Sequence, residues 1–102
     1  MLSGHNKQQP MNATRAEAIA ATALAFLAED AVRLAQFLSV TGLSLQDLRR
    51  QAASHQLLAA VLEYLADNES LLLVFASGAG LSPAEVAPAR NVLLGTPQHG
   101  GP

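Results

Sequence analysis

The strongest constraint on the fold of this chain is an internal repeat with a period of 38 residues. Residues 19–52 align without a gap with residues 57–90, and ten of the 34 aligned pairs are identical. The identities include matched Phe, Gly and Ser positions, which chance supplies less easily than Leu and Ala in a chain rich in both. A repeat of this length is one supersecondary unit that buries its apolar face against a neighbour. We therefore predict two tandem units, residues 15–52 and 53–90.

Each unit has the pattern of three helices. Its first part carries apolar residues three and four positions apart, the spacing of one face of an α-helix. An eight-residue segment follows later, TGLSLQDL at residues 41–48 and AGLSPAEV at residues 79–86. Its Gly suits the left-handed position after a helix, and its Ser with an acid three residues on is typical of a capping box. Helices are expected near residues 14–29, 31–41, 45–53, 55–67, 69–78 and 83–93.

The predicted fold class is all-α, a compact six-helix bundle made of the two units. Half of the residues are hydrophobic but only 4% are aromatic, because Ala and Leu, both strong helix formers, supply the apolar mass. Residues 71–76 (LLLVFA) also fit a buried strand, but their counterparts at 33–38 are amphipathic at helical spacing. We predict one helical domain at 13–94, with flexible tails at 1–12 and 95–102.

Two further predictions concern helix ends. Asp30 and Asn68 are suited to cap the second helix of each unit, because their side-chain oxygens accept bonds from the first amides. If the last helix begins after Ser82, Pro88 lies beyond its first turn. The missing N–H of Pro88 is then expected to kink or split that helix.

Charge and composition narrow the function classes. The formal net charge of −2 offers no positive field to nucleic acid or anionic lipid, and a chain without Cys has no thiolate chemistry. No apolar run approaches the ~18 residues that span a bilayer, so we expect no membrane segment. Residues 18–28 resemble a signal peptide, but Glu17 interrupts the approach and the pattern recurs in mid-chain. The chain is predicted to be cytoplasmic.

Residues of catalytic or ligand-binding type have structural explanations. The sequence GAG at residues 78–80 lacks the strand and the Lys of a phosphate-binding loop, and Gly80 is explained as the end of a helix. The Ser residues are mostly caps, and the acids fit a solvated surface. The three histidines have no partners at metal-ligand spacing: His5, His55 and His99. We predict no enzymatic activity, no cofactor, no metal and no small-molecule substrate.

Five short motifs carry a resemblance to a known family. They are FLAED at 26–30, TGL at 41–43, DLR at 47–49, AAVLEYL at 59–65 and AGLSP at 79–83. Through them the chain resembles a family of short alphaproteobacterial domains of unknown function over residues 15–94. The motifs are mostly core and cap positions, so the resemblance implies a cytoplasmic helical protein and transfers no activity or site residue. Pro88 departs from the family pattern, in which the last helix usually continues.

The two units differ in one directed way. Arg33 and Gln36 of the first unit are replaced by Leu71 and Val74, so the helix at 69–77 is hydrophobic nearly all round and must be covered. Two ways of burying its apolar surface remain possible. One is the chain itself, with this helix at the centre of the bundle. The other is a protein partner or a second copy bound at a surface that contains Leu71 and Val74. We predict a small protein-interaction or regulatory module.

The alternative is a helix-turn-helix-like DNA-binding protein. The joint between the second and third helices places Gln46, Arg49 and Arg50 on a recognition-type helix. The second unit has Ala and Pro at the corresponding positions, which contact neither phosphates nor base edges, and the net charge is negative. Nucleic acid is therefore the less favoured partner.

Overall fold

The computed structural model describes residues 11–95. All regular secondary structure in this range is helical. Residues 71–76 therefore form helix and not strand, and the prediction of six helices is confirmed. The helices are α1 (Ala13–Ala28), α2 (Ala31–Thr41), α3 (Leu45–Gln51), α4 (His55–Ala66), α5 (Glu69–Ala79) and α6 (Val86–Leu93), with the short 3-10 helix η2 (Pro83–Glu85) directly before α6.

The predicted tails lie mostly outside the described residues, which leave out 1–10 and 96–102. At the N-terminal side the described chain is already part of the fold before α1 begins. Met11 packs against the hydrophobic core, and the side chain of Asn12 accepts a hydrogen bond from the Arg15 amide as the cap of α1. Residues 11 and 12 therefore already contact the helical domain.

The joints between the second and third helices follow the predicted chemistry. Gly42 and Gly80 end α2 and α5 with φ of 77° and 71°, the left-handed region in which a Cβ is penalised. In each joint the Ser two positions later forms a capping box with the acid that follows it by three residues. Each capping box satisfies two backbone amides that the start of a helix leaves without partners.

The joints between the first and second helices are capped differently. Asp30 accepts hydrogen bonds from the amides of Val32 and Arg33, as predicted. The same prediction for Asn68 was wrong, because its Nδ2 donates to the Tyr64 carbonyl oxygen at 2.8 Å instead of capping α5. An amide side chain, unlike a carboxylate, carries a donor, and this donor satisfies a carbonyl left open in the last turn of α4.

The last helix is divided, as expected, but the break precedes Pro88 and does not come from a hydrogen bond lost there. Residues Pro83–Glu85 form the 3-10 turn η2 and the α-helix starts at Val86, so Pro88 lies in the first turn of α6. Amides of a first turn have no acceptor within their own helix. The missing N–H of Pro88 therefore removes no helical hydrogen bond, and the helix expected at 83–93 becomes two elements.

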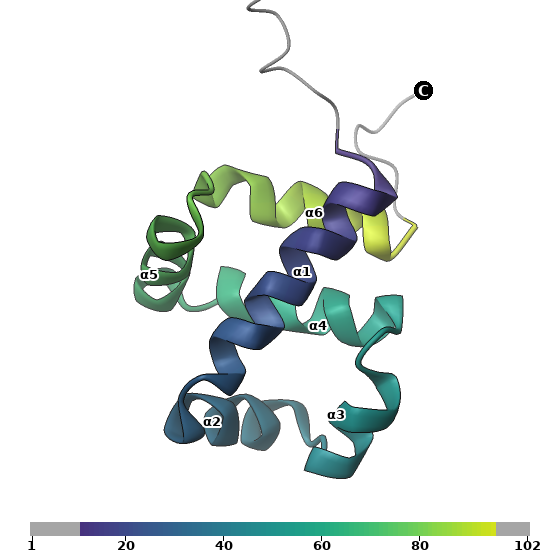
Figure 1. Cartoon of the computed structure of the whole chain (residues 1–102), viewed down its shortest axis with the longest axis vertical. Helices are drawn as coiled ribbons and strands as arrows, with labels where there is room; N and C mark the ends of the chain where they lie inside the picture. The colour runs from purple at the N-terminus through teal and green to yellow at the C-terminus, as the bar shows by residue number, and fades with distance from the viewer. Residues whose placement is uncertain (1–10, 96–102) are drawn as a thin grey trace, which may run out of the picture.

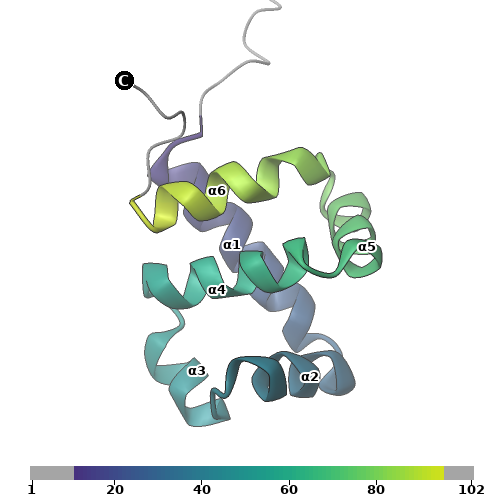
Figure 2. The same ribbon diagram turned by 180° about the vertical axis from the view of Figure 1, so that it is seen from behind.

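Helix α4 lies at the centre of the fold, crossed by α1 and flanked by α6 (Figure 1). Seen from behind, α2 and α3 lie on one side of α4 and α6 on the other (Figure 2). A stripe of small, fully buried residues on α1, Ala16, Ala20 and Ala23, allows its axis to come close to its neighbours. The buried residues of α4 are Leu57, Leu58, Ala59, Val61, Leu62, Tyr64 and Leu65.

The position of α5 shows how much of its apolar surface is buried within the bundle and how much is exposed. Phe75 and Ala76 are its buried residues, whereas Leu73 is 50% and Val74 57% exposed, and Leu71 is partly buried. Of the two possibilities, the one with this helix at the centre of the bundle is therefore not found. Helix α4 takes that position, because it packs against α1 and α6 at the same time.

The third helices of the two units lie in different surroundings. Helix α6 packs extensively against both α1 and α4, whereas α3 has no comparably extensive contact with any described helix. The two units therefore agree in the Gly and Ser positions that join their second and third helices, but not in the packing of the third helices.

Candidate functional site

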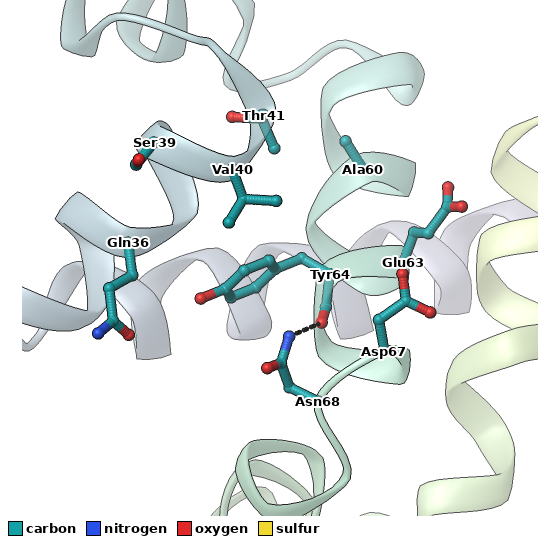
Figure 3. Close-up of a pocket in the computed structure, with 9 residues that line it drawn as sticks. All are labelled: Gln36, Ser39, Val40, Thr41, Ala60, Glu63, Tyr64, Asp67 and Asn68. Carbon is teal, nitrogen blue, oxygen red and sulfur yellow. Dashed lines mark hydrogen bonds between the residues drawn. The ribbon is translucent and has the colours of Figure 1, made fainter.

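A groove between α2, α4 and α5 is the main candidate site. It consists of two hollows of about 500 and 520 Å³, which adjoin because they share Gln36, Tyr64, Asp67 and Asn68. Figure 3 shows the first hollow, with α2 on one side and α4 on the other. The α2–α5 groove is defined by the residues that line either hollow: Gln36, Ser39, Val40, Thr41, Ala60, Glu63, Tyr64, Asp67, Asn68, Glu69, Ser70, Leu71 and Val74.

The apolar part of the groove is built around Tyr64. The ring of Tyr64 packs edge-on against Phe37, with centroids 5.3 Å apart, and its position is therefore well defined. No described residue bonds to its hydroxyl, and no buried polar side-chain atom of the described chain lacks a partner, so the hydroxyl reaches solvent in the groove. Val40 lines the first hollow and Val74 the second, and these side chains are 72% and 57% exposed. The groove thus has apolar walls at both ends.

The charged residues that line the groove are all acidic. They are Glu63, Asp67 and Glu69, and no Lys or Arg of the described chain lines either hollow. Within residues 11–95 the carboxylates of these three acids form no hydrogen bond or ion pair. The acids that do form ion pairs lie elsewhere: Glu17 with His55, Asp47 with Arg50 and Glu85 with Arg15.

Asp67 stands where a helix least favours an acid. It is the C-cap of α4, Glu63 lies one turn earlier, and the last turn of this fully described helix has no basic residue. The open carbonyls at a helix C-terminus carry partial negative charge, so an exposed acid there is unfavourable by about 0.3–1 kcal/mol. The stability of α4 therefore does not explain these two acids.

Both residues predicted from the sequence as an interaction surface line this groove. Leu71 and Val74 face the second hollow from α5. Val74 also lines a third hollow of about 310 Å³ between α1 and α5, together with Phe26. The sequence did not reveal the opposite wall, with Val40 on α2 and Tyr64 on α4, because its residues come from other helices. The signal that could have found Tyr64 is its match to Phe26 in the repeat.

Arg33, the counterpart of Leu71 in the first unit, has a different role. Its guanidinium lies 4.0 Å from the centroid of the Phe26 ring, and its Nη1 donates to the Phe26 carbonyl oxygen at 2.7 Å. Phe26 is in turn the counterpart of Tyr64. The partly buried Phe26 ring thus packs against an arginine, whereas at the matched position Leu71 lines the second hollow together with Tyr64, which is 9% exposed.

The residues of the DNA-binding alternative lie on α3, outside the groove. Arg50 donates to Asp47 at 2.7 Å, within the capping box of this helix. The Ser44 backbone amide, and after it the Ser44 hydroxyl and Arg50, hold the pKa of Asp47 below its ordinary value. The negative charge beside Arg50 is therefore kept. The side chains of Gln46 and Arg49 form no hydrogen bond or ion pair within residues 11–95.

Tertiary structure pairs His55 with a carboxylate on another helix. Its Nε2 lies 2.6 Å from Oε2 of Glu17 on α1, a partner that a search along one helix does not reach. Within residues 11–95 no three His, Asp or Glu side chains are grouped as a metal ion requires, and His5 and His99 lie outside this range.

No single helix of the described chain is long and apolar enough to cross a membrane. Helix α5 and the segment Pro83–Leu93 reach that length and hydropathy only as a pair, and the pair is bent by 104°.

An ion pair between Arg15 and Glu85 joins α1 to η2. The Arg15 guanidinium, and after it the Ser82 amide, hold the pKa of Glu85 below its ordinary value. The folded state therefore favours the ionised carboxylate. This contribution to stability is present above the unfolded-state pKa and is lost as the pH falls through the lower folded-state pKa.

We expect Glu85→Gln to lower the free energy of unfolding at about pH 7 and to lower it less at about pH 3. Gln still accepts the Ser82 amide in a capping box, so the change removes the charge and keeps the cap. Urea unfolding of both proteins at the two pH values measures the effect. A difference between the two proteins that is the same at both pH values would contradict the assignment.

Comparison with known proteins identifies a family but no activity. The chain belongs to a family described as protein of unknown function (DUF3572), whose model matches residues 13–96. This match confirms that the chain is a short domain of unknown function. No curated protein and no solved structure matches the chain.

Proposed function

We propose that this domain is a non-catalytic protein-interaction module that binds a partner protein through the α2–α5 groove. The observation that carries the proposal is the exposure of Val40 and Val74 on two walls of an acidic groove. Clustered exposed apolar side chains on a small domain are typical of a protein-binding surface. No described His lines the groove, so Ser39 and Ser70 have no His beside them there to activate a hydroxyl.

The internal repeat supports the choice of this surface. Residues that line the first hollow of the groove match, by the 38-residue shift, residues that line the third hollow. The matched pairs are Thr22/Ala60, Ala25/Glu63, Phe26/Tyr64, Glu29/Asp67, Val74/Gln36, Gly78/Val40 and Ala79/Thr41. We propose that the two hollows are equivalent sites of a duplicated unit, in which α4 lies against α2 as α1 lies against α5.

The two equivalent sites differ in how open they are. At Phe26 the guanidinium of Arg33 covers the ring and the hollow measures about 310 Å³. At Tyr64, where Leu71 replaces that arginine, the hollow of about 500 Å³ continues into the second one of about 520 Å³. The proposed function therefore assigns binding to the site that lost its arginine.

The proposed setting is the cytoplasm of a bacterium. A chain without Cys is compatible with a reducing compartment, and the motifs quoted above resemble alphaproteobacterial domains. DNA binding through Arg49 and Arg50 is less favoured, because the main groove is acidic and Arg50 is paired with Asp47.

The double variant Leu71→Arg plus Val74→Gln tests the proposal, because it restores the residues of the first unit. By analogy with Arg33, the new guanidinium is expected to cover the Tyr64 ring and close the second hollow. We expect a folded, helical protein whose free energy of unfolding changes by no more than about 0.5–1 kcal/mol. Affinity purification from the protein's own cells, followed by mass spectrometry, is expected to lose the partner that the wild type recovers.

The matched control is Val32→Gln on α2, an apolar-to-polar change at a side chain that is 68% exposed and lines none of the hollows. It is expected to keep the partner. Recovery of the same partner by the double variant would refute the proposed surface. So would a double variant that unfolds from a monomeric wild type, because Leu71 and Val74 would then be part of the core.

A further inference from the structure

We infer that the α2–α5 groove binds a basic amphipathic helix of a partner protein, with Lys or Arg residues beside a short apolar face. This inference rests on the proposed function and specifies the chemistry of the partner. It follows from four features of the groove: its acidic rim, its protruding aliphatic side chains, its division into two adjoining hollows, and its helical walls.

The charge of the groove requires a basic partner. Its three acids have no partner within residues 11–95, and two of them stand at the C-terminal end of α4, where they are unfavourable for the helix itself. A cationic partner would neutralise both the acids and the negative end of the helix. Such complementarity speeds association and rejects partners of the wrong sign. Nucleic acid and anionic lipid, which are negative, would be repelled.

The exposed aliphatic residues require a partner wider than the groove. Val40 and Val74 stand at its two ends, and Leu73 is exposed beside Val74 on α5. A small molecule inside either hollow would leave much of these side chains in water. A protein segment lying across both hollows would cover them and remove apolar surface from water.

The shape of the groove suits a helix. Its walls are three helices, and no strand edge exists within the described range to pair with an extended peptide. Helices bind such grooves through apolar side chains three or four positions apart. The two hollows can each receive one of these side chains, with the Tyr64 hydroxyl and Gln36 placed between them for polar contact.

A second copy of this chain is a poorer occupant. In a twofold-symmetric dimer the same surface meets itself, so Glu63, Asp67 and Glu69 of one protomer would face the same acids of the other. The charge that favours a basic helix therefore opposes self-association through this groove.

The chain provides its own probe for the experiment. Tyr64 is its single tyrosine and it has no Trp, so tyrosine emission reports on the groove. The ligands are two synthetic amphipathic helices without aromatic residues, one built of Leu and Lys and one with Glu in place of each Lys. Anisotropy of a dye on each peptide gives its affinity, and a change in tyrosine emission places binding at Tyr64.

We expect the Lys peptide to bind at least about tenfold more tightly than the Glu peptide and to weaken as salt rises from about 50 to about 200 mM. The variant Glu63→Gln, Asp67→Asn and Glu69→Gln is expected to lose at least about tenfold in affinity. Its melting temperature is expected to change little, because the gain at the C-terminal end of α4 is offset by the loss of the Glu69 charge from the first turn of α5. Glu17→Gln, an acid on α1 outside the groove, is the control and should keep the affinity within about twofold.

Equal affinity for both peptides, or no binding of the Lys peptide, would overturn the inference. So would a wild-type dimer in light scattering that Leu71→Arg plus Val74→Gln converts to a monomer, since a second copy would then fill the groove. If that double variant loses the cellular partner but the Lys peptide does not bind the wild type, the basic-helix inference fails and the proposed function stands. If the double variant keeps the cellular partner, the proposed function itself fails.

Discussion

Replacement of Phe75 by Ala is expected to lower the free energy of unfolding by about 3–5 kcal/mol. The side chain of Phe75 is 1% exposed, and its ring lies 5.4 Å from the ring of Phe26, so it holds α5 against α1. Truncation removes this buried surface and leaves a cavity between the two helices, because the surrounding backbone relaxes only in part. A domain of this size has about 5–15 kcal/mol of stability, so the variant is expected to be marginal.

The matched control is Leu73→Ala, two residues earlier on the same helix and 50% exposed. We expect it to change the free energy of unfolding by no more than about 0.5 kcal/mol, since the side chain has little buried surface to lose. Urea unfolding followed by circular dichroism measures both variants. Losses of similar size would show that Leu73 is covered and would contradict the position of α5 at the edge of the bundle.

Replacement of Ala20 by Leu is expected to lower the free energy of unfolding by about 1–3 kcal/mol. Ala20 is fully buried on α1, in the stripe of small residues that allows this helix to lie close to its neighbours. A larger side chain there has no space and must displace α1 or adopt a poor rotamer. The change adds apolar surface and replaces one good helix former by another, so neither hydrophobicity nor helix propensity predicts the loss.

Ala21→Leu, the same substitution one position later, is the control because Ala21 is exposed. The two variants have identical composition, so their difference in melting temperature isolates packing. We expect Ala21→Leu to unfold like the wild type within about 0.5 kcal/mol. A neutral Ala20→Leu would mean that α1 does not approach α4 and α6 as closely as the structure places it.

The proposed duplication of a helical unit offers a physical account of how the proposed binding site could arise. Arg33 covers Phe26 through a cation–π contact and a hydrogen bond to a carbonyl, so the first site needs no partner. Leu71 has no polar group to make these contacts at Tyr64. Under the proposed duplication, an arginine at this position would fill part of the hollow beside Tyr64 that Leu71 leaves open.

Helices and most of their ends could be predicted from the sequence, because their chemistry is local. The bonds of a capping box join Ser44 and Asp47, three positions apart, and the left-handed turn at Gly42 depends on one residue. Prediction failed at Asn68, where the side chain had a choice between two backbone partners. It donates to the carbonyl oxygen of Tyr64 in the helix before it, and propensity alone does not decide that choice.

Only the tertiary structure decided which helix is central and where the groove lies. The sequences of α4 and α5 are both strongly apolar, which says that each must be covered but not by what. Helix α4 packs against α1 and α6, whereas α5 keeps Leu73 and Val74 exposed. Comparison of the two units pointed to Leu71 and Val74. The groove also contains Tyr64 of α4 and residues of α2, of which Gln36 is the most distant from Val74 along the chain. No local pattern contains residues 38 positions apart, so the groove exists only after the three helices have packed.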